Sequence, residues 1–284
     1  MKEASSYLVL VNKPVGITSR DVVNKLNHIL TTKKIGHTGT LDPLASGVLV
    51  CLVGKYTKLG ELITSLDKEY VAKIKLGIKT DTGDITGNTL ETSSYKPSRK
   101  LVEKVFSEFP KKYMQTVPKY SAVKINGKKL YEYARENIDI KLPEREVTIY
   151  NLELLSYEND TITFKAKVSK GTYIRALIED ICDRINCLGT MSALERTMQG
   201  KFKLENSFTL EDIENGEFIF QKIADFLDIP VYSIPKTYLT KVLNGAKLPD
   251  IFSISNLVLL TDKGEEVAIY QKENDYLRPY IMLK

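Results

Sequence analysis

Residues 36–49 read GHTGTLDPLASGVL, and glycine and proline are denser here than elsewhere in the chain. Pro43 biases Asp42 away from helical backbone angles, and the flanking glycines allow the backbone to approach a ligand closely. Residues 47–53 form a short apolar run that is typical of a buried strand. Asp42 is therefore predicted on a sharply shaped loop that enters a strand, a position that suits a nucleophile or a general base. The alternative is an aspartate that caps its own turn.

Hydrophobic patterns on both sides of this loop predict a mixture of strands and helices. Residues 7–11 form an apolar run typical of a buried strand, and Ser19 can cap a helix whose apolar stripe extends over residues 22–30. Over residues 69–77 the pattern alternates, so that one face of a strand carries Tyr70, Ala72, Ile74 and Leu76.

The middle of the chain continues this mixture. A helical pattern follows Ser98 and is stopped by Pro110, and Asn126-Gly127 is a turn signal because both residues tolerate positive φ. Residues 147–157 and 161–168 are expected to pair as strands, and residues 172–185 to form a helix. The pattern predicts an α+β fold with a large antiparallel or mixed sheet.

The C-terminal part is expected to be a small β-rich module. Residues 205–228 are acidic and indicate a helical connector, which Ile229-Pro230 interrupts. A short helix is then expected over residues 236–243, followed by strands over 257–260, 267–271 and 280–283. About fifty residues are too few for independent stability, so this module should dock on the rest. We expect two domains, 1–228 and 229–284.

The composition is that of a soluble globular protein, with 284 residues, a net charge of +5, 43% hydrophobic and 27% charged side chains. The longest nearly apolar stretch, residues 44–53, is about half the length that crosses a bilayer, and no secretory leader is evident. We expect a cytoplasmic protein without a membrane segment. Positive charge gathers in residues 1–60 and 111–150, which fits a polyanion-binding face. The alternative is ordinary solvation of lysines.

Several kinds of site find no support in the sequence. Three cysteines without a C-x-x-C pair predict buried thiols rather than disulfides, and only two histidines are present, so no metal site is expected. Gly47 and Gly54-Lys55 have the wrong spacing for a phosphate loop, and Tyr56 replaces its Ser or Thr. A G-x-S-x-G nucleophile elbow is absent from the sequence.

Six motifs in order give a resemblance over about two-thirds of the chain. NKPVGITS, GHTGTLDPLASGVL, KEY, TDTGD, YSAVKINGKKLYEYAR and SKGTYIR resemble the TruB family of tRNA pseudouridine-55 synthases. The resemblance implies the pseudouridine-synthase fold, a PUA-like C-terminal domain and a reaction without a cofactor. In that reaction the C1′–N1 bond of a uridine is cleaved, the uracil turns, and C1′ is joined to C5.

The resemblance also implies three catalytic residues. Asp42 matches the family's catalytic aspartate, Tyr70 the tyrosine that stacks on the flipped base, and Arg175 the arginine that pairs with the aspartate. An adjacent guanidinium favours the charged form of a carboxylate, and aromatic stacking is the usual way to hold a flipped base. The alternative for Tyr70 is an ordinary core residue.

Further matches imply substrate-binding positions at His37, Lys58, Asp84, Lys170, Tyr173 and Leu194. His37 could instead be a solvent-facing loop side chain, Lys58 a solvated lysine, Asp84 the former of an Asx turn, and Leu194 a side chain that only excludes water. The basic, tyrosine-rich residues 119–135 resemble the family's substrate-contacting region, where lysines would meet phosphates and tyrosines would stack on bases.

We expect a stand-alone tRNA pseudouridine synthase that acts on the uridine at position 55 in the T-arm loop. The expected partner is the T-arm and elbow of tRNA, bound by a monomer that needs no obligatory protein partner. Two alternatives stay open from the residues: a non-catalytic tRNA-folding chaperone, and a guide-RNA-dependent relative.

Overall fold

The computed structural model describes residues 6–136 and 138–284, which form two compact units. The first unit comprises the described residues up to Pro43, then Gly47–Ser65 and Gly200–Lys284, and the second comprises Leu44–Ser46 and Leu66–Gln199. In the part of the chain that the structure describes, no helix is long and apolar enough to cross a membrane.

The first unit begins with a small antiparallel sheet. Strand β3 (Ala45–Val53) pairs with both β1 (Tyr7–Lys13) and β2 (Ile35–Thr38), and α1 (Ser19–Ile29) packs on it. The core between them contains the apolar stripe predicted for the helix, with Val22, Val23 and Leu26 buried. The helix is capped by Thr18 rather than Ser19, because Thr18 and Asp21 form a reciprocal capping box.

Two short helical segments follow β3, namely η1 (Gly54–Leu59) and α2 (Gly60–Thr64). The expected helical connector over residues 205–228 is wrong. It contains the single-turn η2 (Leu204–Asn206), α6 (Leu210–Glu214) and η3 (Ile223–Asp225). The main-chain groups of Phe208 and Gln221 instead form hydrogen bonds with the main chain of β1. These backbone groups are therefore satisfied by the edge of a strand and not by hydrogen bonds within a helix.

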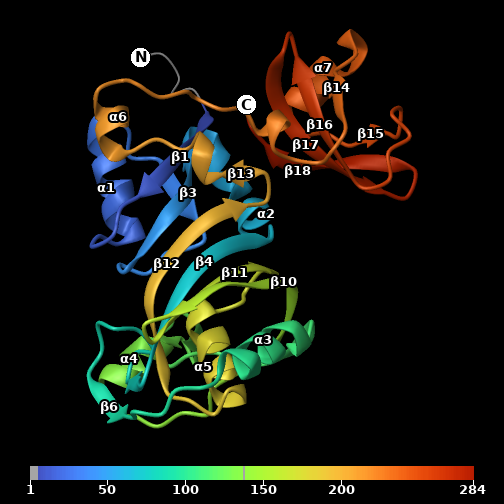
Figure 1. Cartoon of the computed structure of the whole chain (residues 1–284). Coiled ribbons are helices and arrows are strands. Elements are labelled where there is room, and N and C mark those ends of the chain that lie inside the picture. Colours follow the sequence, from blue (N-terminus) through green and yellow to red (C-terminus); the bar gives the residue numbers. More distant parts are fainter. Residues whose placement is uncertain (1–5, 137) are drawn as a thin grey trace. The chain divides into compact units, whose positions relative to one another are not determined.

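The expected β-rich C-terminal module forms a five-stranded sheet in the order β14-β16-β17-β18-β15 (Figure 1). Its elements are β14 (Val231–Ser233), α7 (Lys236–Leu243), β15 (Leu248–Pro249), β16 (Leu257–Asp262), β17 (Glu265–Glu273) and β18 (Tyr276–Met282). Strand β14 pairs parallel to β16 and the other pairs are antiparallel, with a separate core beneath α7. The domain boundary between residues 228 and 229 stays a prediction.

Glu266 holds this sheet to the preceding part of the first unit. Its buried carboxylate accepts hydrogen bonds from the Tyr56 hydroxyl in η1 and from the main-chain N–H groups of Ile223 and Ala224. Burial raises the pKa of the Tyr56 phenol, which therefore stays a donor at neutral pH. A module of this size gains stability from such a fixed attachment.

The second unit is built on antiparallel strands in the order β12-β4-β11-β10-β7. These strands are β4 (Lys68–Leu76), β7 (Lys112–Thr116), β10 (Glu144–Glu158), β11 (Thr161–Val168) and β12 (Gly189–Gln199). Burial alternates along β4 as the sequence predicts, with Tyr70, Ala72, Ile74 and Leu76 on the buried face. The hairpin between β10 and β11 turns through Asn159 and Asp160, both at positive φ.

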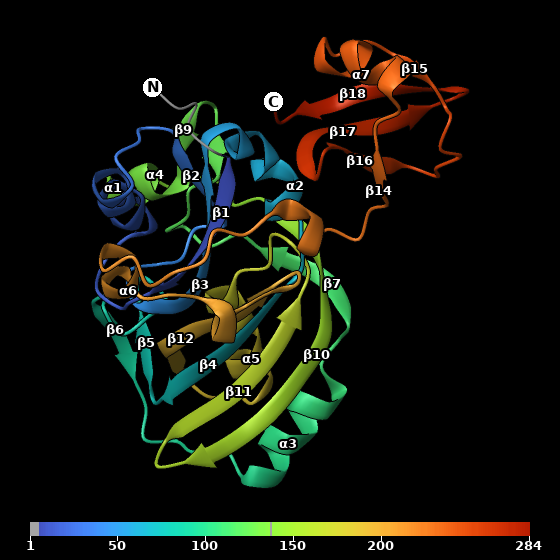
Figure 2. The same cartoon turned by 90° about the horizontal axis from the view of Figure 1, so that it is seen from above.

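Two helices lie against this sheet, α3 (Arg99–Glu108) and α5 (Ile174–Arg184) (Figure 2). Phe106 of α3 meets Phe164 of β11 edge to face at 5.7 Å, and because Phe164 is opposite Ala72 in the register, the helices cover the face that carries Tyr70. Two small hairpins complete the unit: β5 (Ile78–Thr80) with β6 (Thr89–Thr92), and β8 (Lys124–Ile125) with β9 (Lys128–Lys129), which leads into α4 (Leu130–Arg135).

Candidate active site

The loop that carries Asp42 joins β2 to β3 in the first unit and is fixed on both sides of the aspartate. The Ser19 hydroxyl accepts a hydrogen bond from the N–H of Leu41 at 2.9 Å and donates to its carbonyl at 3.2 Å. The N–H of Gly16 donates to the carbonyl of Pro43 at 2.8 Å. These three bonds use main-chain atoms of the residues next to Asp42, so they fix the half-buried aspartate without occupying its carboxylate.

The turn that supplies Gly16 is itself organised by a buried lysine. Lys13 has no exposed surface, and its ammonium group donates to the carbonyls of Pro14 at 2.8 Å and Ile17 at 2.7 Å. Gly16 adopts φ +94°, which favours glycine. The motif NKPVGITS thus holds the Asp42 loop in place through the bonds of Gly16 and Ser19. Sequence reasoning treated Ser19 as a helix cap and missed this contact, because no local pattern signals a partner 22 residues away.

Tyr70 lies on β4 in the second unit and is 8% exposed. It is opposite Ala166 of β11 and Arg196 of β12, so these three side chains share the face that the helices cover. Leu194 is opposite Ala72 and is likewise buried on that face. Tyr70 therefore has an apolar neighbour on one strand and a cationic neighbour on the other. Its stacking role stays a prediction.

Lys68 begins the same strand and is an unexpected buried cation. Its ammonium group donates to the carbonyl of Leu66 at 2.6 Å. Burial, together with the nearby positive charges of Arg196 and Lys170, lowers the pKa of Lys68 to about 8, against an opposing contribution from Asp67. The end of the sheet next to Tyr70 is therefore electropositive.

Arg175 is the second residue of α5 and its guanidinium ties together three of the motifs. One nitrogen donates to the carbonyl of Thr82 at 2.9 Å, in the TDTGD loop, and another donates to the carbonyl of Tyr120 at 2.8 Å, in the YSAVKING segment. The residue is 9% exposed. A planar guanidinium suits this geometry because it offers several donors in fixed directions.

Asp84 caps its own turn, as the Asx alternative predicted. One carboxylate oxygen accepts hydrogen bonds from the hydroxyls of Thr82 and Thr86 and from the main-chain N–H of Thr86 at 2.9 Å. These bonds shape the loop whose Thr82 carbonyl receives Arg175. A substrate-binding role for Asp84 stays a prediction.

The other predicted residues occupy different places. His37 is half-buried on β2 opposite Cys51, and Lys58 is exposed in η1, where its ammonium group donates to the carbonyl of Met282 at 2.9 Å. Lys170 is exposed in the turn between β11 and α5. Tyr173 is the residue that precedes the first turn of α5.

The second unit brings several of these residues to one end of its sheet. Val168, the last residue of β11, is opposite Lys68, and α5 begins only six residues later. The start of α5, with Tyr173 and Arg175, therefore lies at the end of the sheet where β4 begins, two residues before Tyr70. Asp42, His37 and Lys58 belong to the first unit.

The predicted tRNA-contacting segment carries its own cation–aromatic contacts. The hairpin turns through Asn126 and Gly127, both at positive φ as the sequence predicts. The ammonium group of Lys128 lies 4.9 Å from the ring centre of Tyr133, and Lys129 lies 5.2 Å from that of Tyr131. The tyrosines of this segment thus stack on neighbouring cations, which holds lysine charge at fixed places on the surface.

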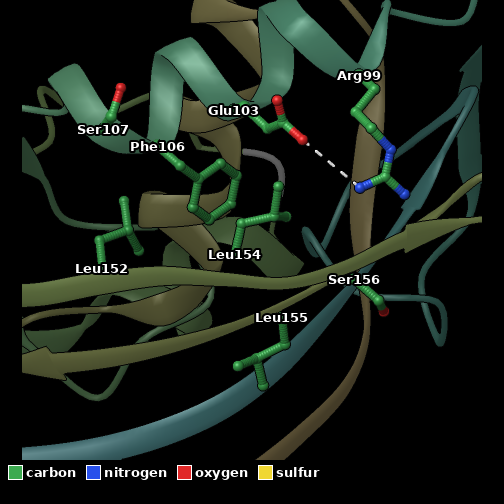
Figure 3. Close-up of a pocket in the computed structure, with 8 residues that line it drawn as sticks. All are labelled: Arg99, Glu103, Phe106, Ser107, Leu152, Leu154, Leu155 and Ser156. Carbon is green, nitrogen blue, oxygen red and sulfur yellow. Dashed lines mark ion pairs between the residues drawn. The ribbon is translucent and has the colours of Figure 1, made fainter.

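A surface groove of about 310 Å³ lies between α3 and β10 (Figure 3). Its lining mixes apolar and polar side chains, and Arg99 pairs with Glu103 there at 3.6 Å. None of the nine predicted site residues lines it; the lining residues are Arg99, Glu103, Phe106, Ser107, Leu152, Leu154, Leu155 and Ser156.

Among residues 6–136 and 138–284, no group of three or more His, Cys, Asp or Glu side chains is placed to hold a metal ion. The cysteines Cys51, Cys182 and Cys187 are buried thiols that form no disulfide. Burial raises the pKa of the Cys182 and Cys187 thiols, so both are inert as nucleophiles at neutral pH.

Comparison with known proteins agrees with this architecture. The chain resembles the solved structure of a Cbf5-Nop10-Gar1 complex, with a TM-score of 0.75, 25% identity, and coverage of 98% of this chain and 85% of that one. It also resembles the structure of an H/ACA RNP bound to a substrate RNA containing 2′-deoxyuridine, with a TM-score of 0.73 and 25% identity over the same shares. The fold class is thus that of the pseudouridine synthases, as the sequence predicted.

Sequence comparison defines the family within that class. Residues 27–174 match the family described as TruB family pseudouridylate synthase (N terminal domain). The chain is 39% identical to tRNA pseudouridine synthase B of Mesoplasma florum, over 95% of this chain and 94% of that protein. It is 40% identical to the protein of the same name from Caldanaerobacter subterraneus, over 95% and 96%. The chain belongs to the TruB family.

Proposed function

We propose that this protein converts the uridine at position 55 of the tRNA T-arm loop into pseudouridine, with Asp42 as the nucleophile and without a cofactor. The general reaction follows from family membership: the chain is an isomerase that turns a tRNA uridine into pseudouridine. The choice of uridine and the roles of individual residues are our proposal.

The reaction is balanced without any external reagent. The C1′–N1 bond breaks and a C1′–C5 bond forms, while the proton lost from C5 is replaced by one gained at N1. An ionised carboxylate can form a transient covalent bond to the sugar or the base, which divides this rearrangement into easier steps. Asp42 is the residue proposed for that bond, whether it attacks C1′ or C6.

The other residues then have distinct tasks. Tyr70 is proposed to stack on the flipped uracil and hold it while it turns, and Leu194 to exclude water from the detached base. Arg175 is proposed to hold the Asp42 carboxylate ionised and in one orientation. His37 is proposed to help displace the target nucleotide from the RNA loop, and Asp84, Lys170 and Tyr173 to line the substrate.

The observation that carries this proposal is the fixing of the Asp42 loop from both sides. Ser19 and Gly16 hold the main chain of Leu41 and Pro43, so the aspartate is presented on a rigid support within a motif shared with the family.

Binding of tRNA is proposed to use the basic segment 119–135, Lys58 and the C-terminal sheet, with the PUA-like module at the acceptor end. Phosphate contacts release counterions, so tRNA affinity should fall steeply with added salt, whereas the turnover of bound RNA should change little. An affinity that stays flat from low to moderate salt would contradict this binding face. The protein is proposed to act in the cytoplasm, as a monomer and without an obligatory protein partner.

The test is modification of an unmodified tRNA transcript by the purified protein alone, with carbodiimide mapping of pseudouridine. The expected result is complete modification at position 55 and none in a transcript whose T-arm uridine is replaced by cytidine. Activity that requires an added guide RNA would contradict the stand-alone enzyme. Binding and refolding of tRNA without any pseudouridine would instead support a chaperone.

A further inference from the structure

Gln115 on β7 holds the main chain of Tyr173, at the start of α5. The side-chain oxygen of Gln115 accepts the N–H of Tyr173 at 2.8 Å, and its nitrogen donates to the carbonyl of the same residue at 3.3 Å. Gln115 is 1% exposed. A buried amide that bonds both main-chain groups of one residue fixes the position of that residue in two directions.

A hydroxyl group fixes the orientation of this amide. The Tyr113 hydroxyl donates to a carboxylate oxygen of Asp180 on α5 at 2.6 Å, so its oxygen is left to accept from the Gln115 nitrogen at 2.9 Å. Burial raises the pKa of the Tyr113 phenol, which keeps it protonated as this arrangement requires. With the nitrogen committed to Tyr113, the oxygen of the amide must face the N–H of Tyr173.

Arg145 contacts the same tyrosine through its ring. It is directly opposite Gln115 in the pairing of β10 with β7, so the two side chains are neighbours on one face. Its guanidinium lies 5.6 Å from the centre of the Tyr173 ring. Gly171 leaves room for it, since a β-carbon there would lie 2.9 Å from a guanidinium nitrogen of Arg145.

We propose that Gln115 and Arg145 are positioning residues for the isomerisation: together they hold Tyr173 and, through the first turn of α5, set the place of Arg175. This inference rests on the proposed function. Neither residue is proposed to touch the uridine. Because Tyr173 caps the helix in which Arg175 is the second residue, a shift at position 173 moves the backbone that carries the guanidinium.

The first test compares Gln115→Leu with Tyr113→Phe in steady-state kinetics over a range of concentrations of an unmodified tRNA transcript. Gln115→Leu removes both bonds to Tyr173 and should lower kcat about tenfold to a hundredfold while changing KM little, because misplaced groups act on the reaction step. Tyr113→Phe loses the bonds of its hydroxyl to Asp180 and to the Gln115 nitrogen but keeps both Gln115 atoms that bond Tyr173. Its kcat should therefore fall less than that of Gln115→Leu.

The pH dependence of kcat in Gln115→Glu tests the positioning role, because a residue that only stabilised the fold would leave this dependence unchanged. A protonated carboxyl group can both donate to and accept from the Tyr173 main chain, whereas an ionised one can only accept. The kcat of this variant relative to wild type should therefore rise as the pH is lowered. The charged or titratable groups around this network are Tyr113 on the same strand, Arg145 on β10, and Glu179, Asp180, Asp183 and Arg184 on α5.

Amide hydrogen exchange distinguishes failure of this inference from failure of the proposed function. Exchange over residues 173–177 should become faster in Gln115→Leu, whether or not the wild type modifies tRNA. Unchanged exchange, a kcat of Gln115→Leu within threefold of wild type, or an unshifted pH profile in Gln115→Glu would each overturn the positioning role. Inactive wild type would overturn the proposed function instead.

Discussion

The Asp42 loop and the start of α5 are held in different ways. Asp42 is supported by a partner 22 residues away in the chain, through main-chain atoms and one serine hydroxyl. Arg175 and Tyr173 are supported by partners 55 to 93 residues away, through the long side chains of Arg175 and Gln115. Both supports are tertiary, but the proposed nucleophile is held by a segment nearer in the chain than the segments that hold the groups proposed to orient it.

This difference predicts how each region fails when it is altered. The support of the Asp42 loop includes one hydroxyl that bonds both main-chain groups of the buried Leu41, so removing that hydroxyl should reduce stability and displace the loop together. The start of α5 is held by several side-chain hydrogen bonds that come from separate strands and loops. When one of these bonds is lost, the side chains proposed for the site can shift while the other bonds keep the protein folded. Substitutions on the α5 side should therefore separate kcat from stability more cleanly than those on the Asp42 side.

Arg175→Lys should have the largest effect after loss of Asp42 itself. Lysine keeps the charge but cannot reach the carbonyls of Thr82 and Tyr120 with fixed donors, so the cation is free to move. We expect kcat to fall about 100-fold, with a melting temperature close to that of wild type. Single-turnover assays and thermal melts measure the two quantities. A kcat within threefold of wild type would show that charge alone suffices at position 175.

Ser19→Ala should have the next largest effect, and on both quantities. It leaves the N–H and carbonyl of the buried Leu41 without their partner, which costs about 1–3 kcal/mol of unfolding free energy. We expect kcat to fall about tenfold because the Asp42 loop loses one support. Urea unfolding and single-turnover assays measure these effects.

Thr18→Ala is the matched control for Ser19→Ala. It removes the capping box of the same helix without touching Leu41, and should cost about 1 kcal/mol of stability while leaving kcat unchanged. An equal loss of kcat in both variants would mean that the stability of α1, rather than the contact with Leu41, controls the loop.

Lys68→Met should have the smallest effect, visible as a change in the pH dependence of stability. The pKa of Lys68 is lowered to about 8 in the folded protein, so between this pH and its usual value near 10.5 the unfolded chain binds more protons. Lys68 therefore makes stability rise with pH in that window, by about 1 kcal/mol from about pH 7.5 to about pH 9. Denaturant unfolding should show a weaker rise in the variant; an identical slope would contradict the depressed pKa.

Elements with a clear hydrophobic period could be predicted from the sequence. Helices α3 and α7, strand β4 and the turns at Asn126-Gly127 and residues 159–160 are as expected, because their apolar spacing and turn residues are local signals. Strand β12 was missed. Its residues GTMSALERTMQ include a buried arginine and a buried glutamine, and pairing with β4, rather than its own pattern, makes it extended.

The candidate site was predictable only where a motif marks it. Asp42, Tyr70 and Arg175 were found by resemblance, whereas Gln115 and Ser19 have ordinary sequence surroundings and show their roles only through contacts distant in the chain. The connector over residues 205–228 was predicted as helix because its composition is helical, but pairing with β1 overrides that preference.

The central claim is that the carboxylate of Asp42 performs the chemistry, and Asp42→Asn tests it most directly. The amide keeps the size and shape of the side chain but is a far weaker nucleophile. In single-turnover assays on an unmodified tRNA transcript, we expect pseudouridine formation to fall at least about 1000-fold, with tRNA affinity within about threefold of wild type. A variant that forms pseudouridine at a rate within tenfold of wild type would contradict the account.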